Sequence, residues 1–322
     1  MNSIPKSKVS RLLKETRHLK DGDRKTCRPL VTLFAIPKPF DDPHIAVIQK
    51  NAIRSWAHLS PHVEVILFCN KEHSCEVAHQ EIESLECVQV LPIRVNDRGT
   101  PILSDAFEKA HRFGSGQLLM YSNCDLIFGD TLLSLIERLS SWANDETSSL
   151  VKDFLAIGQR TDLKVDTSVN MSCQDAVSEL FQRANKEGKL DSVVCKDYFL
   201  FPKTLLTDIP DFLVGRGNWD NWIVWHAKQA NVPVIDLTAQ LAVIHQNHDY
   251  KHVPGGRKQV YISGEEARQN QTLSGGRRLV SGSTATWELT ENTLKKRRFP
   301  VLKMLRDTPK FLRLLRNITF LG

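Results

Sequence analysis

Short apolar runs alternate with amphipathic segments along the first third of the chain. The runs at residues 30–36, 63–68 and 87–93 are rich in β-branched and aliphatic side chains, which is typical of buried strands. After the first run, Asp42 and Pro43 suit an N-cap and a first helical residue, and apolar residues recur behind them at helical spacing. This alternation predicts an α/β fold with a doubly wound, mostly parallel sheet.

The next apolar stretch has polar residues in its middle. Gln117–Tyr121 is predicted to be a buried strand, and Leu126–Phe128 has the composition of a second buried segment. Asp125 lies between the two. An ionised carboxylate is costly to bury there unless it has a partner or a metal, and ligands collect at the carboxyl ends of strands in open α/β sheets. Asp125 is therefore a candidate ligand-binding residue; the alternative is that it only caps a turn.

The same patterns predict the remaining elements. The polar segment 160–195 is expected to form an insertion beside the sheet, and 248–282 has many glycines and polar residues with little periodicity. Helices are expected at 73–84, after Thr100-Pro101, after Gly129-Asp130, at 175–186 and at 219–230, and further strands at 154–158, 198–206, 232–237 and 241–246.

The composition is that of an ordinary globular protein of 322 residues, 41% hydrophobic and 25% charged. This length allows one large α/β domain or two small ones. The formal net charge is +6, and the basic residues concentrate at the two ends of the chain. We expect a basic N-terminal extension at 1–28, a single α/β domain at 29–262, and a polar loop with a basic amphipathic tail at 263–322.

Membrane and disulfide signals are weak. No apolar run approaches the roughly 18 residues of a transmembrane helix, and the basic N-terminus lacks the long apolar stretch of a secretory signal. The seven cysteines have no paired spacing, and several lie in or beside apolar runs, as buried thiols do in a reducing compartment. A cytoplasmic location is expected.

Three features together resemble the nucleotide-sugar glycosyltransferases of the GT-A fold, most closely the inverting family-2-type enzymes. The first is the motif YSNCDLIF at 121–128, which follows an apolar strand. The second is Trp219-Asp220-Asn221 at the start of a late helix, followed by HAKQANVPVID. The third is His245 after a short strand. The resemblance covers roughly residues 29–250, and it depends on the order and spacing of the motifs.

The resemblance implies a metal site for a divalent cation, Mn²⁺ or Mg²⁺, which neutralises the diphosphate leaving group. Asp125 is the expected direct ligand. His245 is expected as a second ligand or a phosphate hydrogen-bond donor, and the alternative is a core histidine. Asn123 replaces the family's first aspartate, so it brings an amide oxygen without charge, and strict metal dependence stays open. Asn123→Asp is expected to hold or increase metal affinity.

The resemblance also implies a general base, Asp220, facing the acceptor hydroxyl from a helix N-terminus. The alternative is that Asp220 only offsets the helix dipole. Trp219 stands where the family often has glutamate, and it is expected either to stack on a sugar ring or to pack in the core. Asp197 and Asn221 are expected to contact the acceptor or the sugar.

The remaining expected site residues contact the nucleotide sugar, with ordinary polar loop or surface residues as the alternative. The loop 245–258 is expected to act as a lid over the bound donor. Two arginines among the contacts suit a diphosphate, because a guanidinium binds such oxygens bidentately. The nucleotide-sugar contacts are Ala35, Ile36, Pro37, Lys38, Asn70, Arg98, Ser104, Asn123, Arg160 and Arg216.

These features favour a hexosyltransferase-like enzyme that transfers sugar from a nucleotide donor to a glycan, lipid-linked or small-molecule acceptor. A nucleotidyltransferase is disfavoured because the loop after the first strand, IPKPFDD, has no glycine. A catalytically weak or inactive sugar- or nucleotide-binding protein is the alternative. Nucleic-acid binding is disfavoured, since aromatic residues do not interleave with the basic tails.

The basic segment 295–316 carries apolar residues on one side of a predicted short helix. It is expected either to dock on the catalytic domain or to lie on an anionic membrane surface as a peripheral anchor.

Overall fold

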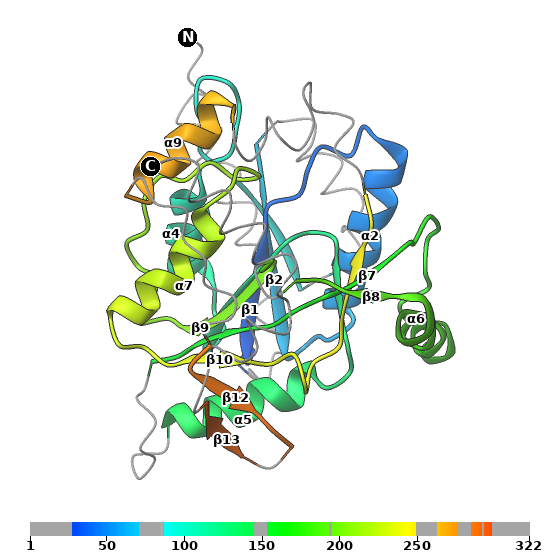
Figure 1. Ribbon diagram of the computed structural model, residues 1–322. Coiled ribbons are helices and arrows are strands. Elements are labelled where there is room, and N and C mark those ends of the chain that lie inside the picture. Colours follow the sequence, from blue (N-terminus) through cyan, green and yellow to red (C-terminus); the bar gives the residue numbers. More distant parts are fainter. Residues whose placement is uncertain are drawn as a thin grey trace, which may run out of the picture.

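A large central sheet organises the fold (Figure 1). The computed structural model describes residues 28–70, 85, 87–144, 153–192, 195–248, 263–275, 285–291 and 293–297. The strands of this sheet are β1 (Val31–Ala35), β2 (Val63–Cys69), β3 (Val88–Pro92), β4 (Leu118–Ser122), β6 (Leu155–Ile157), β9 (Tyr198–Pro202), β10 (Val234–Asp236), β12 (Trp287–Leu289) and β13 (Leu294–Lys296). Within the described residues these nine strands lie side by side in the order β13-β12-β10-β6-β9-β4-β1-β2-β3.

Most of these strands are parallel, as the sequence predicted. β9 is an exception, because it runs antiparallel to both neighbours, β4 and β6. Ser122 at the end of β4 is paired with Tyr198 at the start of β9. The residues just before β9 therefore lie beside the residues just after β4.

Helices cover both faces of the sheet, as expected for a doubly wound fold. α2 (Pro43–Ala57) and α5 (Leu132–Asn144) pack on one face, and α4 (Leu103–Phe113) and α7 (Trp219–Gln229) pack on the other. Alternate residues of β1 serve the two cores: Leu33 faces the first, and Phe34 packs in an aromatic cluster whose closest ring centroid, that of Phe107, is 5.0 Å away. The run 30–36 is apolar at every position except Thr32 because both faces of the strand are buried.

The predicted cap of α2 is confirmed. The Asp42 carboxylate accepts hydrogen bonds from the backbone N–H groups of His44 and Ile45, at 2.8 and 3.0 Å, and Pro43 is the first helical residue. These bonds satisfy amides that have no partner within the helix.

A second, smaller sheet lies beside the first. It consists of β5 (Leu126–Phe128), β7 (Thr161–Leu163), β8 (Lys189–Leu190) and β11 (Val243–Gln246), in the order β5-β11-β7-β8, with α6 (Gln174–Glu187) packed against it. The expected insertion at 160–195 thus forms part of a separate sheet. The two apolar runs flanking Asp125 belong to different sheets, so Asp125 lies at the junction where the chain passes from one to the other.

The sheet continues past residue 262, where the sequence placed the end of the domain. α9 (Glu265–Leu273) and the hairpin of β12 and β13 were not predicted, because these elements are short and polar. The Asn270 side chain makes two hydrogen bonds to the Leu213 backbone. Its Nδ2 donates to the Leu213 carbonyl at 3.0 Å, and its Oδ1 accepts from the Leu213 N–H at 2.8 Å. The predicted helix at 73–84, the extension at 1–27, the lid from 249 to 258 and the basic tail from 298 lie outside the described residues.

No helix within the described residues has the length and apolar character needed to cross a bilayer.

Candidate functional site

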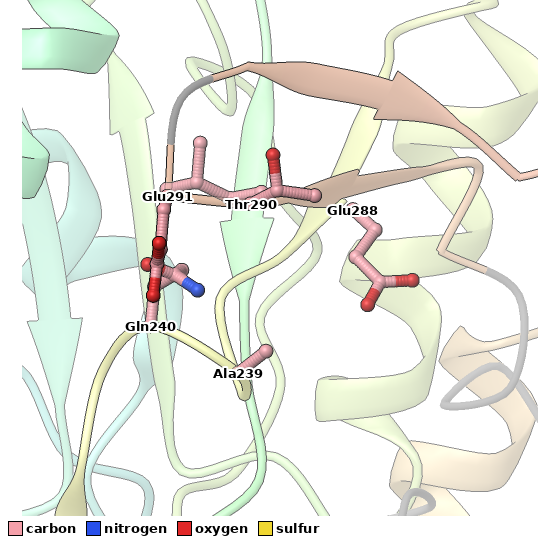
Figure 2. A pocket seen from close by; sticks show the side chains of 6 residues that line it. Ala239, Gln240, Glu288, Thr290 and Glu291 are labelled. Carbon is pink, nitrogen blue, oxygen red and sulfur yellow. The ribbon is translucent and has the colours of Figure 1, made fainter.

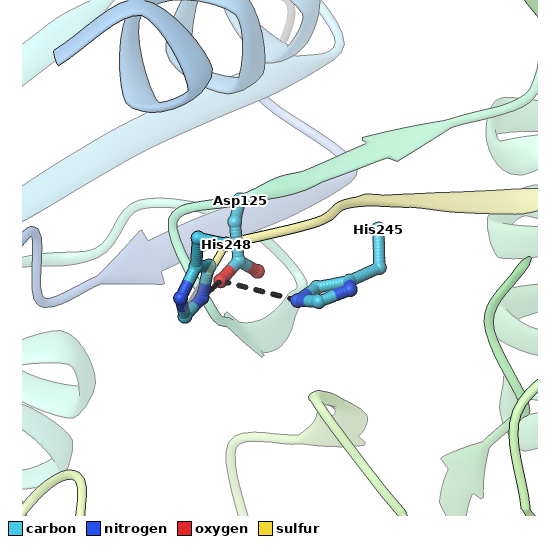
Figure 3. Close-up of side chains that lie close together, drawn as sticks. All are labelled: Asp125, His245 and His248. Atoms are coloured by element: carbon cyan, nitrogen blue, oxygen red, sulfur yellow. Dashed lines mark hydrogen bonds and ion pairs between the residues drawn. The ribbon is translucent and has the colours of Figure 1, made fainter. Parts of the chain in front are cut away.

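The candidate site is centred on Asp125, at the junction between β4 and β5. Only 9% of Asp125 is exposed. Its Oδ2 atom lies 3.1 Å from Nε2 of His248 and 3.6 Å from Nε2 of His245. Figure 3 shows the carboxylate between the two imidazole rings. One ligand atom from each of the three residues falls within 4.8 Å of the others, which is a spacing that can hold a metal ion.

The charges in this cluster are strongly coupled. Burial raises the pKa of Asp125, but the charges of and hydrogen bonds from His245 and His248 outweigh it and hold the pKa well below its usual range. Burial lowers the pKa of His245, but Asp125 and Asp162 outweigh it and raise the value to about 9. Asp125 Oδ1 is buried and has no hydrogen-bond partner within the described residues.

Strand pairing sets the orientation of His245. β11 pairs with β7 so that His245 stands opposite Asp162, and His245 Nδ1 lies 2.9 Å from Asp162 Oδ1. The other ring nitrogen, Nε2, is thereby directed at Asp125. A carboxylate behind an imidazole is the usual arrangement that fixes the tautomer and the ring orientation of a metal-binding histidine.

Arg160 joins this cluster to a second carboxylate. Its guanidinium pairs with Asp162 and Asp191, each at 3.2 Å, and with Asp197. Burial lowers the pKa of Arg160, but the surrounding carboxylates outweigh it and raise the pKa. The expected diphosphate contact is therefore already engaged by carboxylates.

Asn123 is held by Asp197, not directed at Asp125. Its Nδ2 donates to Asp197 Oδ1 at 2.6 Å, and its Oδ1 accepts from the Tyr121 hydroxyl at 3.2 Å. The antiparallel pairing of β4 and β9 produces this contact, since it also bonds the Asn123 N–H to the Asp197 carbonyl at 2.8 Å. A carboxylate at position 123 would face another carboxylate, which argues against the expected gain from Asn123→Asp.

Lys38 lies on the other side of the cluster. Its Nζ is 3.4 Å from His248 Nδ1, and its backbone is fixed by Gln49, which accepts from the Lys38 N–H at 2.6 Å and donates to its carbonyl at 3.0 Å. Ala35 and Pro37, which precede it after β1, are buried, and Ile36 is half-buried. Of the expected nucleotide contacts, Lys38 lies directly against His248, and Arg160 reaches the cluster through Asp162.

The expected base, Asp220, lies in the first turn of α7. Burial raises the pKa of Asp220, and the charge of Lys196 offsets this only in part. Lys196 is only 4% exposed and donates from Nζ to Asn221 Oδ1 at 2.9 Å. Trp219 is buried, with its ring centroid 5.2 Å from that of Tyr121. This packing corresponds to the core alternative for Trp219.

The other expected nucleotide contacts form a different group around the loop at 96–100. Asn70 donates to the Gly99 carbonyl at 3.0 Å, Arg98 pairs with Glu265, and Arg216 donates from Nε to Glu266 at 2.8 Å. Ser104 is engaged elsewhere, by Asp211. Arg98 and Arg216 thereby join α9 to neighbouring loops.

A shallow pocket of about 340 Å³ lies beside β12 (Figure 2). Residues of the turn before β11 and of the β12 hairpin line it, and none of them is an expected site residue. They are Ala239, Gln240, Glu288, Leu289, Thr290 and Glu291.

Three important members of the site were not predicted from the sequence: Asp162, Lys196 and His248. His248 follows His245 by three residues, and this H-x-x-H spacing was the available signal. Asp162 belonged to the presumed insertion, and Lys196 directly precedes an expected residue. Their places depend on strand pairing between distant segments.

A solved structure with this fold confirms the GT-A prediction. TarS from S. aureus, in complex with UDP-GlcNAc, matches with a TM-score of 0.50 and 10% identity over 76% of this chain and 65% of that chain. The mannosyltransferase PcManGT from Pyrobaculum calidifontis, in complex with GDP-Man and Mn²⁺, gives a TM-score of 0.41 and 14% identity over 76% of this chain and 64% of that chain.

This chain thus spans less than two thirds of either relative. No family model matches the sequence, and no curated protein matches it. The likeness to TarS shows a GT-A-type α/β fold, the architecture of nucleotide-sugar transferases.

Proposed function

We propose that this chain is a glycosyltransferase that moves a sugar from a nucleoside-diphosphate donor to an acceptor hydroxyl. The observation that carries the proposal is the cluster of Asp125, His245 and His248 at the end of a central strand in a GT-A-type fold. The solved complexes with UDP-GlcNAc and GDP-Man support the class of donor.

The residues of the cluster fit a divalent cation. Asp125 offers a buried oxygen that lacks a partner within the described residues, and two imidazole nitrogens face the same carboxylate. Such a cation, when bound, neutralises charge on the leaving diphosphate. Asp125, His245 and His248 would hold it, and Mn²⁺ or Mg²⁺ is the expected ion.

Lys38 is proposed to bind the donor phosphates. Its ammonium group lies against His248, beside the proposed metal site, and Gln49 fixes its backbone on the loop after β1. A lysine charge at this place attracts the diphosphate. It also stabilises the negative charge that develops on the diphosphate as the bond to the sugar breaks. Asn70, Arg98, Ser104 and Arg216 stay predicted nucleotide contacts.

Asp220 is proposed as the general base of an inverting transfer. Burial raises the pKa of this carboxylate, which makes it a better proton acceptor from the attacking hydroxyl. Lys196 and Asn221 position it from the adjoining loop and the same helix turn. Asp197, the predicted acceptor contact, is proposed to act through Arg160 and Asn123.

A thermal-shift screen of UDP and GDP sugars, with and without Mn²⁺, tests the proposal. At least one donor is expected to stabilise the parent chain in a metal-dependent way, and Asp125→Ala is expected to abolish that shift without unfolding the protein. Equal shifts in the parent and in Asp125→Ala would remove Asp125 from the site. No shift with any donor would contradict donor binding.

A binding protein without turnover is the second candidate function. Asn123 is committed to Asp197, and Trp219 is packed against the core, so two positions depart from the family's catalytic pattern. Donor binding without release of nucleoside diphosphate, in the presence of varied acceptors, would favour this candidate.

The acceptor class and membrane attachment are also part of the proposal. The basic segment 295–316 is proposed to attract the enzyme to an anionic membrane that carries a lipid-linked acceptor. Liposome co-sedimentation of the full chain at low and high salt tests it, because screening weakens such binding. Sedimentation that does not depend on salt would contradict the electrostatic anchor.

A further inference from the structure

Helix α9 holds the loop that leads into α7. Asn270 of α9 is fully buried, and its Oδ1 accepts from the Leu213 N–H at 2.8 Å. Its Nδ2 donates to the carbonyls of Leu213 and Gly217, at 3.0 and 3.2 Å. Gly217 lies two residues before the first residue of α7. One side chain thereby fixes both ends of the loop segment 213–217.

A second side chain of α9 holds the same loop between these two points. The Glu266 carboxylate accepts from Nε and Nη2 of Arg216, at 2.8 and 2.5 Å. It also accepts from Asn96 Nδ2 at 2.8 Å and from the Thr100 hydroxyl at 2.6 Å. Hydrogen bonds between charged groups are stronger than those between neutral groups. Glu266 therefore ties the loop before α7 firmly to the loop at 96–100.

The backbone of this loop bends sharply just before α7. Gly215 has a φ of 73° and Asn218 a φ of 82°, so both lie in the left-handed region. An asparagine in that conformation costs free energy, which the surrounding contacts must offset. Asn218 is the N-cap residue of α7, and its side chain makes no capping hydrogen bond within the described residues. The start of α7 is thus held by α9, where most helices are held by a cap of their own.

The first turn of α7 carries Asp220, the proposed base, three residues after Gly217. The body of the helix is packed independently of α9, because Trp222 and Ile223 lie in the core. Loss of the contacts from α9 is therefore expected to loosen the start of α7 and to leave the rest of the helix in place. A shift of about 1 Å in a reacting group can lower a rate by about 10²-fold.

We infer that α9 positions Asp220 for the transfer reaction, and that Asn270 is a positioning residue that acts through the Leu213 and Gly217 backbone. The use of Asp220 as a base rests on the proposed function, whereas the hold of α9 on the loop is independent of it. Two separate measurements therefore test the two halves.

Hydrogen exchange of the full chain, without any ligand, measures the hold on the loop. Asn270→Ala is expected to speed amide exchange in peptides covering 211–219 by about 10-fold, the effect of losing one buried hydrogen bond. Gln269→Ala changes the exposed neighbour on the same helix, and it is the matched control with unchanged exchange. Glu266→Gln keeps the side-chain shape, removes its charge, and is expected to speed the same exchange even if Asn270→Ala does not fold.

A double-mutant cycle with Asp220→Asn measures the use of the hold. Asn270→Ala is expected to lower kcat for transfer by about 10–100-fold, with the Kd of the donor changed by less than about two-fold. In the Asp220→Asn background the same substitution is expected to lower kcat by less than about two-fold, because the base that it positions is already absent. A purely structural role would lower kcat equally in both backgrounds.

The outcomes distinguish this inference from the proposed function. Unchanged exchange over 211–219 in both Asn270→Ala and Glu266→Gln overturns the inference, and so does an equal loss of kcat in the two backgrounds. Faster exchange with unchanged kcat in Asn270→Ala would leave the proposed function standing while the positioning role fails. Faster exchange with no turnover of any donor by the parent would support the hold of α9 on the start of α7 while the proposed function fails.

Discussion

Replacing Asn123 by aspartate is the perturbation that most directly probes the network behind the site. In the metal-free protein, the new carboxylate would stand where the Asn123 amide now donates to Asp197 Oδ1 at 2.6 Å. The substitution is isosteric, so it removes a donor and adds a negative charge without changing the packing. From the family pattern alone, this change is expected to help metal binding, and the contact with Asp197 predicts that it destabilises the fold.

The size of the destabilisation depends on which of two states costs less free energy. Either both carboxylates stay charged and repel each other, or one of them stays protonated. Two unit charges 2.6 Å apart repel by about 6 kcal/mol at an effective dielectric constant of about 20. Keeping one carboxyl protonated at pH 7 instead costs about 4 kcal/mol, because its ordinary pKa is near 3.9 and each pH unit is worth about 1.4 kcal/mol. Protonation is the cheaper route, so the loss of unfolding free energy is at most about 4 kcal/mol at pH 7.

The sign of the pH dependence is then fixed. The folded variant holds one proton more than the unfolded chain, and its pKa is raised, so its stability falls as pH rises above the unfolded value. The expected loss of unfolding free energy falls to about 1.5 kcal/mol at pH 5. Urea unfolding of the parent and of Asn123→Asp at pH 5, 6 and 7, in EDTA, measures it.

Two controls complete the test. Asn170→Asp changes an exposed asparagine, and it is expected to shift stability by no more than about 0.5 kcal/mol. Combining Asn123→Asp with Asp197→Asn exchanges the amide and the carboxylate, and it is expected to recover more than half of the loss. A penalty that is the same at pH 5 and pH 7, or no recovery in the double variant, would refute the reasoning.

Three further predictions concern the base, the α9 contact and the junction of the sheets. Asp220→Asn is expected to keep donor binding and to lower transfer by roughly 10²–10⁴-fold, and weakened donor binding would instead place Asp220 in the binding site. Because the pKa of Asp220 is raised by burial, the parent rate is expected to fall as pH drops through a value above the ordinary one, and a pH–rate profile checks this. Glu266→Gln, opposite Arg216, is expected to cost about 1.5–3 kcal/mol of stability near pH 7 by urea unfolding; since the folded pKa of Glu266 is lowered, the difference from the parent should fade as pH drops through it. Trp56→Phe removes the 2.9 Å hydrogen bond from the indole N–H to the Leu126 carbonyl. It is expected to cost about 1–3 kcal/mol of stability by the same assay. Unchanged stability of Glu266→Gln or of Trp56→Phe would contradict the contact that the substitution removes.

Much of the fold could be predicted because its signals are local. Asp42 and Pro43 mark the start of α2 whatever the rest of the chain does, and a nearly continuous apolar run such as that of β1 indicates a strand covered on both faces. The hairpin of β12 and β13 gave no such signal. Its strands are three residues each; β12 pairs with β10, and β13 pairs with β12.

The site could be predicted only in part, for a related reason. Asp125 is a polar residue inside an apolar stretch, so burial alone made it a candidate. Asp162 and Lys196 gave no local sign, because their roles come from the register of β7 against β11 and from the loop before β9. Arg160 is predicted to contact a diphosphate, and the carboxylates that folding brings to its guanidinium gave no sign in the sequence.

Release of nucleoside diphosphate from a panel of UDP and GDP sugars, by the parent chain and by Asp125→Asn, tests the central claim most directly. The assay is run with Mn²⁺, with and without candidate acceptors, and Asp130→Asn, an exposed aspartate five residues further on, serves as the matched control. We expect one donor to be consumed by the parent and by Asp130→Asn, and Asp125→Asn to lose that turnover while staying folded. Turnover of the same donor by Asp125→Asn at the parent rate, or no turnover of any donor by the parent, would contradict the account.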